Sequence, residues 1–167
     1  EEFTTISFYK YHKIHQPETF RDELYRAWFA MGVLGRIYIA HEGINAQLAL
    51  PTKNLEVFNT YLDTFSMFKG MRRNFAVEDG KSFFKLKIQV RDKIVADGID
   101  DPSFDAGNCG VHLDATKWNE LMDHPDVTIV EFRNHYESEV GHIKNALLTD
   151  VDTLREQLPK VAEELKK

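Results

Sequence analysis

Side chains of the kinds found in catalytic sites lie close together in the stretch RNHYESEVGHIKNA, residues 133–146. Arg133, Glu137 and His142 supply a guanidinium, a carboxylate and an imidazole, and Gly141 precedes the histidine. Such groups form a catalytic set only together with a nucleophile or a bound reactant. The alternative interpretation is structural: a loop ion pair between Arg133 and Glu137, a turn at Gly141, and a hydrogen-bonded histidine.

The single cysteine, Cys109, lies ahead of this stretch, in the segment GNCG. A reactive thiol needs a helix N-terminus or a nearby cation that favours the thiolate. Asp105 and Asp114 would oppose thiolate formation instead, so we interpret Cys109 as a linker cysteine. His12 and His15 form a lone His-x-x-His pair, which we interpret as solvated surface histidines rather than metal ligands. The sequence therefore predicts no metal site.

A second polar cluster, His41, Glu42 and Asn45, lies in the motif AHEGIN. One interpretation is turn chemistry, in which Gly43 supplies a permissive backbone and Asn45 bonds to it. The other is contact with a substrate, because polar residues of loops often carry function.

The stretch FKLKIQVRDK alternates between apolar and polar residues, which predicts a strand with one buried face. Its polar face could be solvated, docked on a second domain, or in contact with RNA. The apolar set is Phe84, Leu86, Ile88 and Val90, and the polar set is Lys85, Lys87, Gln89 and Arg91.

Charge is distributed unevenly along the chain. The net charge of −6, taken alone, argues against a nucleic-acid partner. However, residues 69–94 contain eight basic and three acidic residues, a local excess of five positive charges. Such a stretch can attract a polyanion to an otherwise acidic protein.

Composition indicates an ordinary globular protein of 167 residues, 43% of them hydrophobic. This is enough for one medium domain or two small ones. Apolar runs such as IYIA are far shorter than the ~20 residues of a membrane span, and the N-terminal residues EEFTTISFYKY show no apolar signal region. A single cysteine argues against a disulfide scaffold. We expect a cytoplasmic protein with no membrane partner.

The periodicity of residues 1–96 predicts the element order β-α-β-β-α-β-β. This is the ferredoxin-like split βαβ pattern with one additional strand, an α+β fold that usually has an antiparallel sheet with both helices on one face. The predicted strands are 3–11, 35–40, 44–50, 72–78 and 82–90, the last two around the turn EDGK, and the predicted helices are 18–31 and 54–65.

Residues 97–112, rich in Asp and Gly, are interpreted as a linker. A helix over 114–125 with Asp114 as its N-cap, an apolar strand over 127–132, and one or two further helices follow. They predict the first part of an α/β domain over 113–167, which has roughly half the residues that such a domain needs.

If the predicted sheet forms, alternation collects aromatic and cationic side chains on the face away from the helices. RNA-recognition sheets use such faces, on which rings stack on unpaired bases and Lys or Arg meets phosphate. The predicted core face takes Ile6, Phe8, Ile37, Ile39, Ala46, Leu48, Leu86 and Ile88, covered by Leu24, Trp28, Phe58 and Leu62. The predicted RNA-facing residues are Tyr9, Tyr11, Arg36, Tyr38, Asn45, Gln47, Lys85, Lys87 and Arg91.

The stretch VTIVEFRNHYESEVGHIKNAL resembles the N-terminal signature of rhodanese-like domains: an apolar strand ending in Asp-x-Arg, a loop with Glu, and Gly-His-Ile-x-Gly-Ala. Glu131 stands where Asp is usual in that signature, and Asn145 stands where Gly is usual. The motifs ISFYKY, AHEGINAQ and DGKSFFKLKIQVRDKIVADGIDDP resemble the bacterial tRNA wobble-uridine hydroxylase family, in which a ferredoxin-like domain precedes a rhodanese-like domain. The residues that match the rhodanese signature are Arg133, Glu137, Gly141, His142, Ile143 and Ala146.

This resemblance implies oxygen-dependent hydroxylation of the wobble uridine of tRNA to 5-hydroxyuridine. The implied partner is the tRNA anticodon loop rather than DNA, and molecular oxygen is the co-substrate, with no metal or organic cofactor. Substrate contacts would come from the RNA-facing residues and from His41, Glu42 and Asn45.

The resemblance also implies a catalytic cysteine in a loop after a later strand of the rhodanese-like domain. The sequence reaches Lys167 before such a strand, so no catalytic residue is assigned and we expect this chain alone to be inactive. A rhodanese-type sulfurtransferase, by domain analogy, and an RNA-binding module without chemistry are the alternatives. The oligomeric state and the tRNA species recognised stay open.

Overall fold

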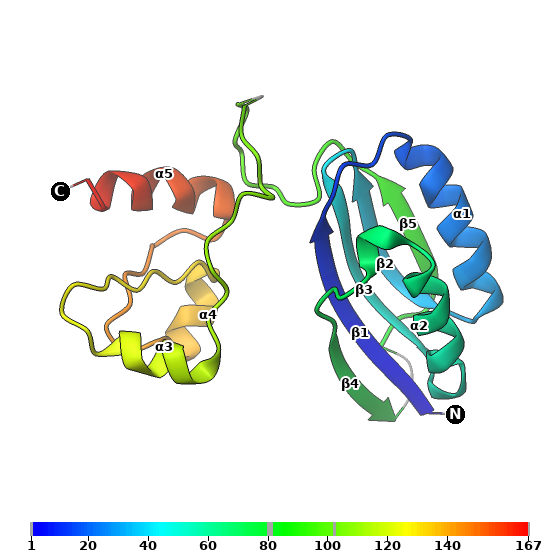
Figure 1. Ribbon diagram of the computed structural model, residues 1–167. Coiled ribbons are helices and arrows are strands. Elements are labelled where there is room, and N and C mark those ends of the chain that lie inside the picture. Colours follow the sequence, from blue (N-terminus) through cyan, green and yellow to red (C-terminus); the bar gives the residue numbers. More distant parts are fainter. Residues whose placement is uncertain (1, 80–81, 102, 167) are drawn as a thin grey trace. The chain divides into compact units, whose positions relative to one another are not determined.

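The computed structural model describes residues 2–79, 82–101 and 103–166, in two compact units (Figure 1). The first unit is Glu1–Val95 and the second is Ala96–Lys167. Among the described residues, no helix is both long enough and apolar enough to cross a membrane.

The first unit contains the predicted β-α-β-β-α-β-β order, which confirms the α+β, ferredoxin-like prediction. Two short 3-10 helices flank the second α-helix. The elements are β1 (Glu2–Tyr11), α1 (Pro17–Ala30), β2 (Leu34–Ala40), β3 (Gly43–Pro51), η1 (Thr52–Asn54), α2 (Leu55–Asp63), η2 (Ser66–Phe68), β4 (Asn74–Asp79) and β5 (Leu86–Val90).

The five strands form one sheet in the order β4-β1-β3-β2-β5. The pairs β1·β3, β1·β4 and β2·β3 are antiparallel, whereas β2 and β5 are parallel. The prediction of an antiparallel sheet is therefore wrong at one edge. The strands β4 and β5 lie at opposite edges, so they do not form a hairpin with each other; the intervening turn EDGK lies partly outside the described residues.

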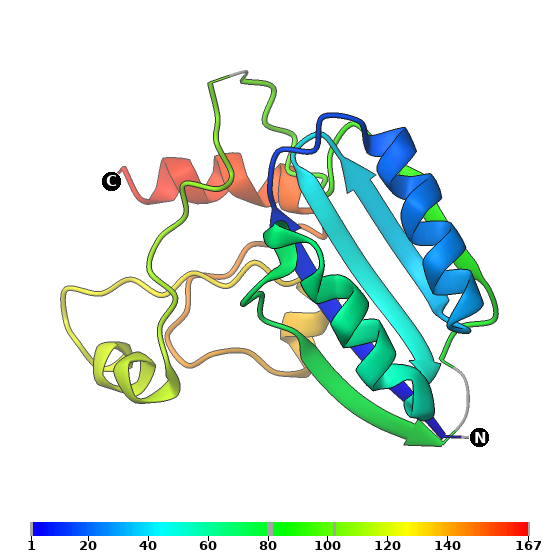
Figure 2. The ribbon, with the colours of Figure 1, turned by 45° about the vertical axis from the view of Figure 1, so that its right-hand side comes forward.

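Both long helices cover the same face of this sheet, as predicted (Figure 2). Trp28 of α1 packs on Phe58 of α2, with ring centroids 5.4 Å apart, and both side chains are fully buried. Every residue predicted for the core belongs to this cluster or packs against it, Leu86 being the partly buried one. Phe84, assigned to the apolar face of its stretch, is 94% exposed, because β5 begins only at Leu86.

Backbone hydrogen bonds define the end of α1, and the side chain of Asn54 also donates to the oxygen of Met31 at 2.8 Å. Val33 N–H donates to Trp28 O and Gly32 N–H donates to Phe29 O, the two bonds of a Schellman motif. Gly32 has a φ of +73°, the left-handed conformation that this motif requires. The chain therefore reverses directly from α1 into β2.

In its described residues, the second unit has three helices joined by loops: α3 (Ala115–Met122), α4 (His135–Val140) and α5 (Leu154–Glu164). Asp114 caps α3 as predicted, accepting a hydrogen bond from Lys117 N–H at 2.9 Å. The predicted strand over 127–132 is wrong: only one isolated parallel bridge, between Val130 and Leu147, forms there. A single bridge pairs only a few backbone N–H and C=O groups. Hydrogen bonds from side chains must therefore stabilise this region.

Gly43, at the β2–β3 bend, has no room for a side chain. Its φ is +153°, and a Cβ atom there would lie 2.1 Å from the backbone oxygen of Lys10. Gly70 also has a positive φ, +70°, but no atom lies within 4 Å of its Cβ position. A side chain at Gly70 would strain only the backbone, whereas a side chain at Gly43 would also collide with β1. Comparing the two positions therefore separates the free-energy cost of the strained conformation from that of the collision.

We predict that Gly43→Ala destabilises the first unit by ~3 kcal/mol, because backbone strain adds to the overlap with β1. Gly70→Ala should cost only about 1 kcal/mol, the conformational term alone. Urea unfolding followed by Trp28 fluorescence, in a Trp118→Phe background, measures both. Equal costs for the two variants would contradict the close approach of the bend to β1.

Candidate functional site

Strand pairing places side chains in rows on the sheet face opposite α1 and α2, which we call the open face. Neighbouring strands are ~4.8 Å apart, so a row across four strands spans roughly 14 Å. Aromatic and polar side chains therefore lie side by side. One row contains Tyr9, Asn45, Tyr38 and Gln89, and the next contains Ser7, Gln47, Arg36 and Lys87.

The tyrosines of the open face have different surroundings. Tyr9 is 57% exposed and meets Tyr11 edge-to-face, with centroids 6.1 Å apart. Tyr38 is only partly exposed, and the guanidinium of Arg91 lies over its ring, 5.0 Å from the centroid. Arg91 also donates to the side-chain oxygen of Gln89 at 3.2 Å. The sequence alternation places Gln89 on this polar face, although Gln89 is not among the predicted substrate contacts.

Three further cations of the predicted set, Arg36, Lys85 and Lys87, are exposed. Lys85 lies just before β5, where its backbone oxygen accepts a hydrogen bond from Gly35 N–H at 2.9 Å. Arg73, also counted in the basic stretch, instead bonds to Asn59 and Asp63 beside α2. The basic stretch therefore does not act as one patch, and Lys81 of that stretch lies outside the described residues.

The polar groups of the β2–β3 bend hold neighbouring loops in place. His41 Nδ1 lies 2.9 Å from the backbone oxygen of Ile14. A carbonyl oxygen only accepts, so Nδ1 carries the proton, and in the neutral ring Nε2 is an acceptor. Glu42 accepts the N–H of Ile94 at 2.7 Å, and Asn45 donates to the oxygen of Ile94 at 3.4 Å. The prediction that Asn45 bonds to the turn itself is therefore wrong.

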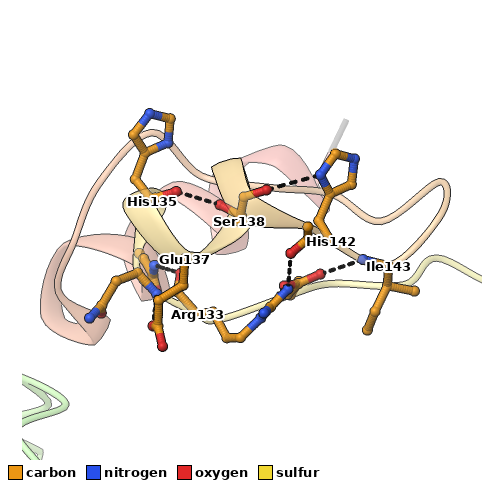
Figure 3. A network of polar contacts seen from close by, with 10 residues as sticks. Arg133, His135, Glu137, Ser138, His142 and Ile143 are labelled. Atoms are coloured by element: carbon orange, nitrogen blue, oxygen red, sulfur yellow. Dashed lines mark hydrogen bonds and ion pairs between the residues drawn. The ribbon is translucent and has the colours of Figure 1, made fainter.

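Polar contacts link the residues of the signature-like segment, residues 131–146 of the second unit (Figure 3). A buried carboxylate, Glu131, organises these contacts. This side chain is only 6% exposed. One oxygen accepts the N–H of Ile143 at 2.8 Å, and the other is paired with Arg133. The hydrogen bond from Ile143 lowers the pKa of Glu131 below its ordinary value, and Arg133 acts in the same direction, against the effect of desolvation.

The structure changes the predicted roles of Arg133 and Glu137. Arg133 pairs with Glu131 and donates to the backbone oxygen of Gly141, so the predicted ion pair with Glu137 does not form. Glu137 instead accepts the backbone N–H of Asn134 at 3.1 Å, completing a capping box at the start of α4. The predicted loop therefore contains a short helix, started by Asn134 and Glu137.

Histidine and glycine of the signature-like segment are structural in this arrangement. His142 Nδ1 lies 3.1 Å from the backbone oxygen of Ser138, so it is the hydrogen-bonded histidine of the structural interpretation. Gly141 has an extended φ of 172°, which any residue can adopt, so a turn does not require glycine there. Asn145 has a φ of +62°. Glycine and asparagine adopt this left-handed conformation more readily than other residues. Asparagine can therefore stand where the rhodanese-like signature usually has glycine.

Gln157 of α5 connects this segment to the third helix and was not foreseen. Its side chain is 1% exposed and donates to the backbone oxygens of Arg133, at 2.7 Å, and Val151, at 3.1 Å. No local pattern distinguishes it from the other polar residues of α5, because its role depends on contacts far along the chain. Within the described ranges, no group of three or more His, Cys, Asp and Glu side chains is arranged to hold a metal ion. Cys109 is exposed.

The lowered pKa of Glu131 predicts a specific dependence on pH. The carboxylate stabilises the second unit above the pKa of an unfolded glutamate, and this contribution is lost as the pH falls through the lower, folded pKa. Glu131→Gln does not titrate, so its unfolding free energy should vary less between about pH 6 and pH 3. Urea unfolding read from NMR signals of residues 129–147 measures this change.

Glu120→Gln, which removes an exposed carboxylate from α3, is the matched control and should keep the wild-type dependence on pH. Identical profiles for Glu131→Gln and the wild type would show that Glu131 does not organise this segment.

Comparison with known proteins identifies relatives of the whole chain. Residues 3–94 match the family described as the UPF0176 acylphosphatase like domain. The tRNA uridine(34) hydroxylase of Salmonella arizonae is 54% identical over 165 residues, which are 98% of this chain and 47% of the relative. The protein of the same name from Salmonella choleraesuis is 55% identical over 165 residues, again 98% and 47% of the two chains.

The tRNA uridine(34) hydroxylase of Escherichia coli is 54% identical over 162 residues, 96% of this chain and 46% of the relative. The chain thus spans about half the length of the curated relatives it matches. The family match covers more than half of the chain and all of the sheet except Glu2. The chain therefore belongs to the UPF0176 acylphosphatase like domain family and is similar to tRNA uridine(34) hydroxylases, as its sequence motifs predicted.

Proposed function

We propose that this protein takes part in the oxygen-dependent hydroxylation of uridine 34, the wobble base of tRNA, to 5-hydroxyuridine. The observation that carries this proposal is the 54% identity over 98% of the chain to proteins named tRNA uridine(34) hydroxylase. Molecular oxygen is the co-substrate in this proposal, and the reaction takes place in the cytoplasm, where tRNA is found.

The open face is the part of the first unit that best suits a tRNA anticodon loop. An exposed ring at Tyr9, amides in the same row, and the exposed cations Arg36 and Lys87 in the next row match the needs of unpaired bases and phosphates. Single strands bind such faces by stacking on rings and by charge contacts along the backbone. We therefore assign tRNA binding to the open face, which includes Asn45, and not to His41 and Glu42 of the bend, which bond to neighbouring loops.

The chemical step needs a group that the second unit does not supply in its described residues. By resemblance, that group is a cysteine in a loop after a later strand, whereas Cys109, the single cysteine of the sequence, precedes α3. Glu131 and Arg133 neutralise each other, and His142 bonds to the backbone. We therefore expect residues 1–167 to bind tRNA without modifying it. A rhodanese-type sulfurtransferase or a purely RNA-binding module would each give a different result in the following test.

Deleting the gene should remove 5-hydroxyuridine and its derivatives from cellular tRNA, and the gene at its natural length should restore them. Residues 1–167 alone should not. Mass spectrometry of digested tRNA measures the nucleosides. Unchanged 5-hydroxyuridine after deletion would refute the proposal and favour a binding module, whereas loss of a thiolated nucleoside instead would favour sulfur transfer.

Binding to the open face should depend on its lysines. We predict that Lys85→Ala combined with Lys87→Ala weakens tRNA binding and reduces the slope of log K against log salt by ~0.7 for each phosphate that is no longer neutralised. Tyr9→Ala should also weaken binding, by about 1–3 kcal/mol because one base no longer stacks, with little change of slope. Filter binding at several salt concentrations measures both quantities.

Lys53→Ala, which removes an exposed charge from η1, is the control and should behave as the wild type. An unchanged affinity in both the lysine and the tyrosine variants, with lower thermal stability in Tyr9→Ala, would show that the open face is packed against protein instead.

A further inference from the structure

We propose that Arg91 and Tyr38 together form a base-stacking platform, on which the outer side of the Arg91 guanidinium receives an unpaired nucleobase of single-stranded RNA. The inference rests on the proposed function, because it requires that the open face binds RNA. It assigns Arg91 a role different from that of the neighbouring lysines: contact with a base rather than with a phosphate.

The platform is built on the paired strands of the sheet. Tyr38 belongs to β2, an interior strand of the sheet, and is paired across β3 and β5 with Asn45 and Gln89. Arg91 follows the last residue of β5, and its backbone N–H still donates to the oxygen of Ile39 at 2.8 Å. Both side chains therefore start from backbone held by the sheet, so the ring and the cation keep a defined separation.

Two interactions orient the guanidinium itself. Its carbon lies over the Tyr38 ring at 5.0 Å from the centroid, within the distance at which a cation is attracted to the face of a ring. One of its N–H groups donates to Gln89 at 3.2 Å. The side chain is nevertheless exposed, so contact with Tyr38 does not enclose it.

A guanidinium in this position suits a base better than a phosphate. Arginine is planar and weakly hydrated, and its flat surface stacks on aromatic rings and bases. The ring of Tyr38 lies beneath the guanidinium carbon, and a base on the exposed side of Arg91 would complete a three-layer stack. Lysine has no plane and contacts phosphate as a point charge. This difference makes Arg91→Lys informative, because the substitution keeps the charge and removes the plane.

Tyr9 would provide a second stacking position in the same row. Strand β3 lies between β1, which contains Tyr9, and β2, which contains Tyr38. The backbones of β1 and β2 are therefore roughly 10 Å apart. Asn45 lies between the two tyrosines in the row. The two platforms could therefore hold two unpaired bases of one loop.

The test uses the full 167-residue chain and an anticodon stem-loop RNA, together with RNAs in which each loop base in turn is replaced by an abasic residue. Arg91→Lys should weaken binding of the intact RNA by about 5- to 150-fold, the range for loss of one stacked base, with the salt slope unchanged. For one abasic RNA, Arg91→Lys should cause almost no further loss. Lys87→Ala is the comparison and should reduce the salt slope and weaken all the RNAs alike.

Three results would overturn the inference while leaving the proposed binding face intact. Wild-type affinity in Arg91→Lys, with a reduced slope in Arg91→Ala, would assign Arg91 to a phosphate. Equal weakening of every abasic RNA by Arg91→Lys would mean that no base stacks there. A lower thermal unfolding temperature in Arg91→Lys, with unaltered RNA affinity, would leave Arg91 a structural role. Absence of RNA binding by the wild type would refute the proposed binding face together with the inference. This result therefore differs from the other three, which refute the inference alone.

Discussion

The register of β3 is the constraint on which the rest of the first unit depends. This strand pairs with β1 along one side and with β2 along the other, so its alternation determines both faces of the sheet. Ile44, Ala46 and Leu48 are fully buried under α1 and α2. A slip of one residue would exchange the two faces of the strand and place Asn45 in the core. Such a slip is opposed at the bend, where Gly43 approaches the β1 backbone too closely for any side chain.

The open face follows from this register, because only one face of the sheet is covered by the long helices (Figure 2). Side chains excluded from the core must collect on the other face, in rows that cross several strands. Parallel pairing of β5 with β2 brings Gln89 beside Tyr38, and the continuing backbone pairing brings Arg91 over the same ring. The contact between Arg91 and Tyr38 therefore depends on the parallel pairing of β5 with β2. The antiparallel sheet expected from the element order does not predict this contact.

The second unit is stabilised differently. Polar contacts of the buried carboxylate of Glu131 take the place of hydrogen bonds between strands. Only one bridge joins Val130 to Leu147, so few backbone groups in this region are paired by strands. Glu131 accepts the N–H of Ile143 and neutralises Arg133, while the buried amide of Gln157 binds the oxygen of Arg133. Breaking such a network leaves buried polar groups unsatisfied, which costs more than the bonds themselves stabilise. The segment that resembles a catalytic signature is thus held by its own polar side chains.

The sequence by itself determined the elements of the first unit, its core residues, the residues of the open face and the family resemblance. These depend on local periodicity and on short motifs, which the backbone geometry of helices and strands imposes directly. Only the tertiary structure decided that β5 pairs in parallel, that Arg91 covers Tyr38 and that Arg133 bonds to Glu131 rather than Glu137. The failed strand over 127–132 has the same origin, since a strand needs a partner and a partner is not a local property. Each of these contacts depends on how residues distant in the sequence come together in the fold, and no local sequence pattern specifies that.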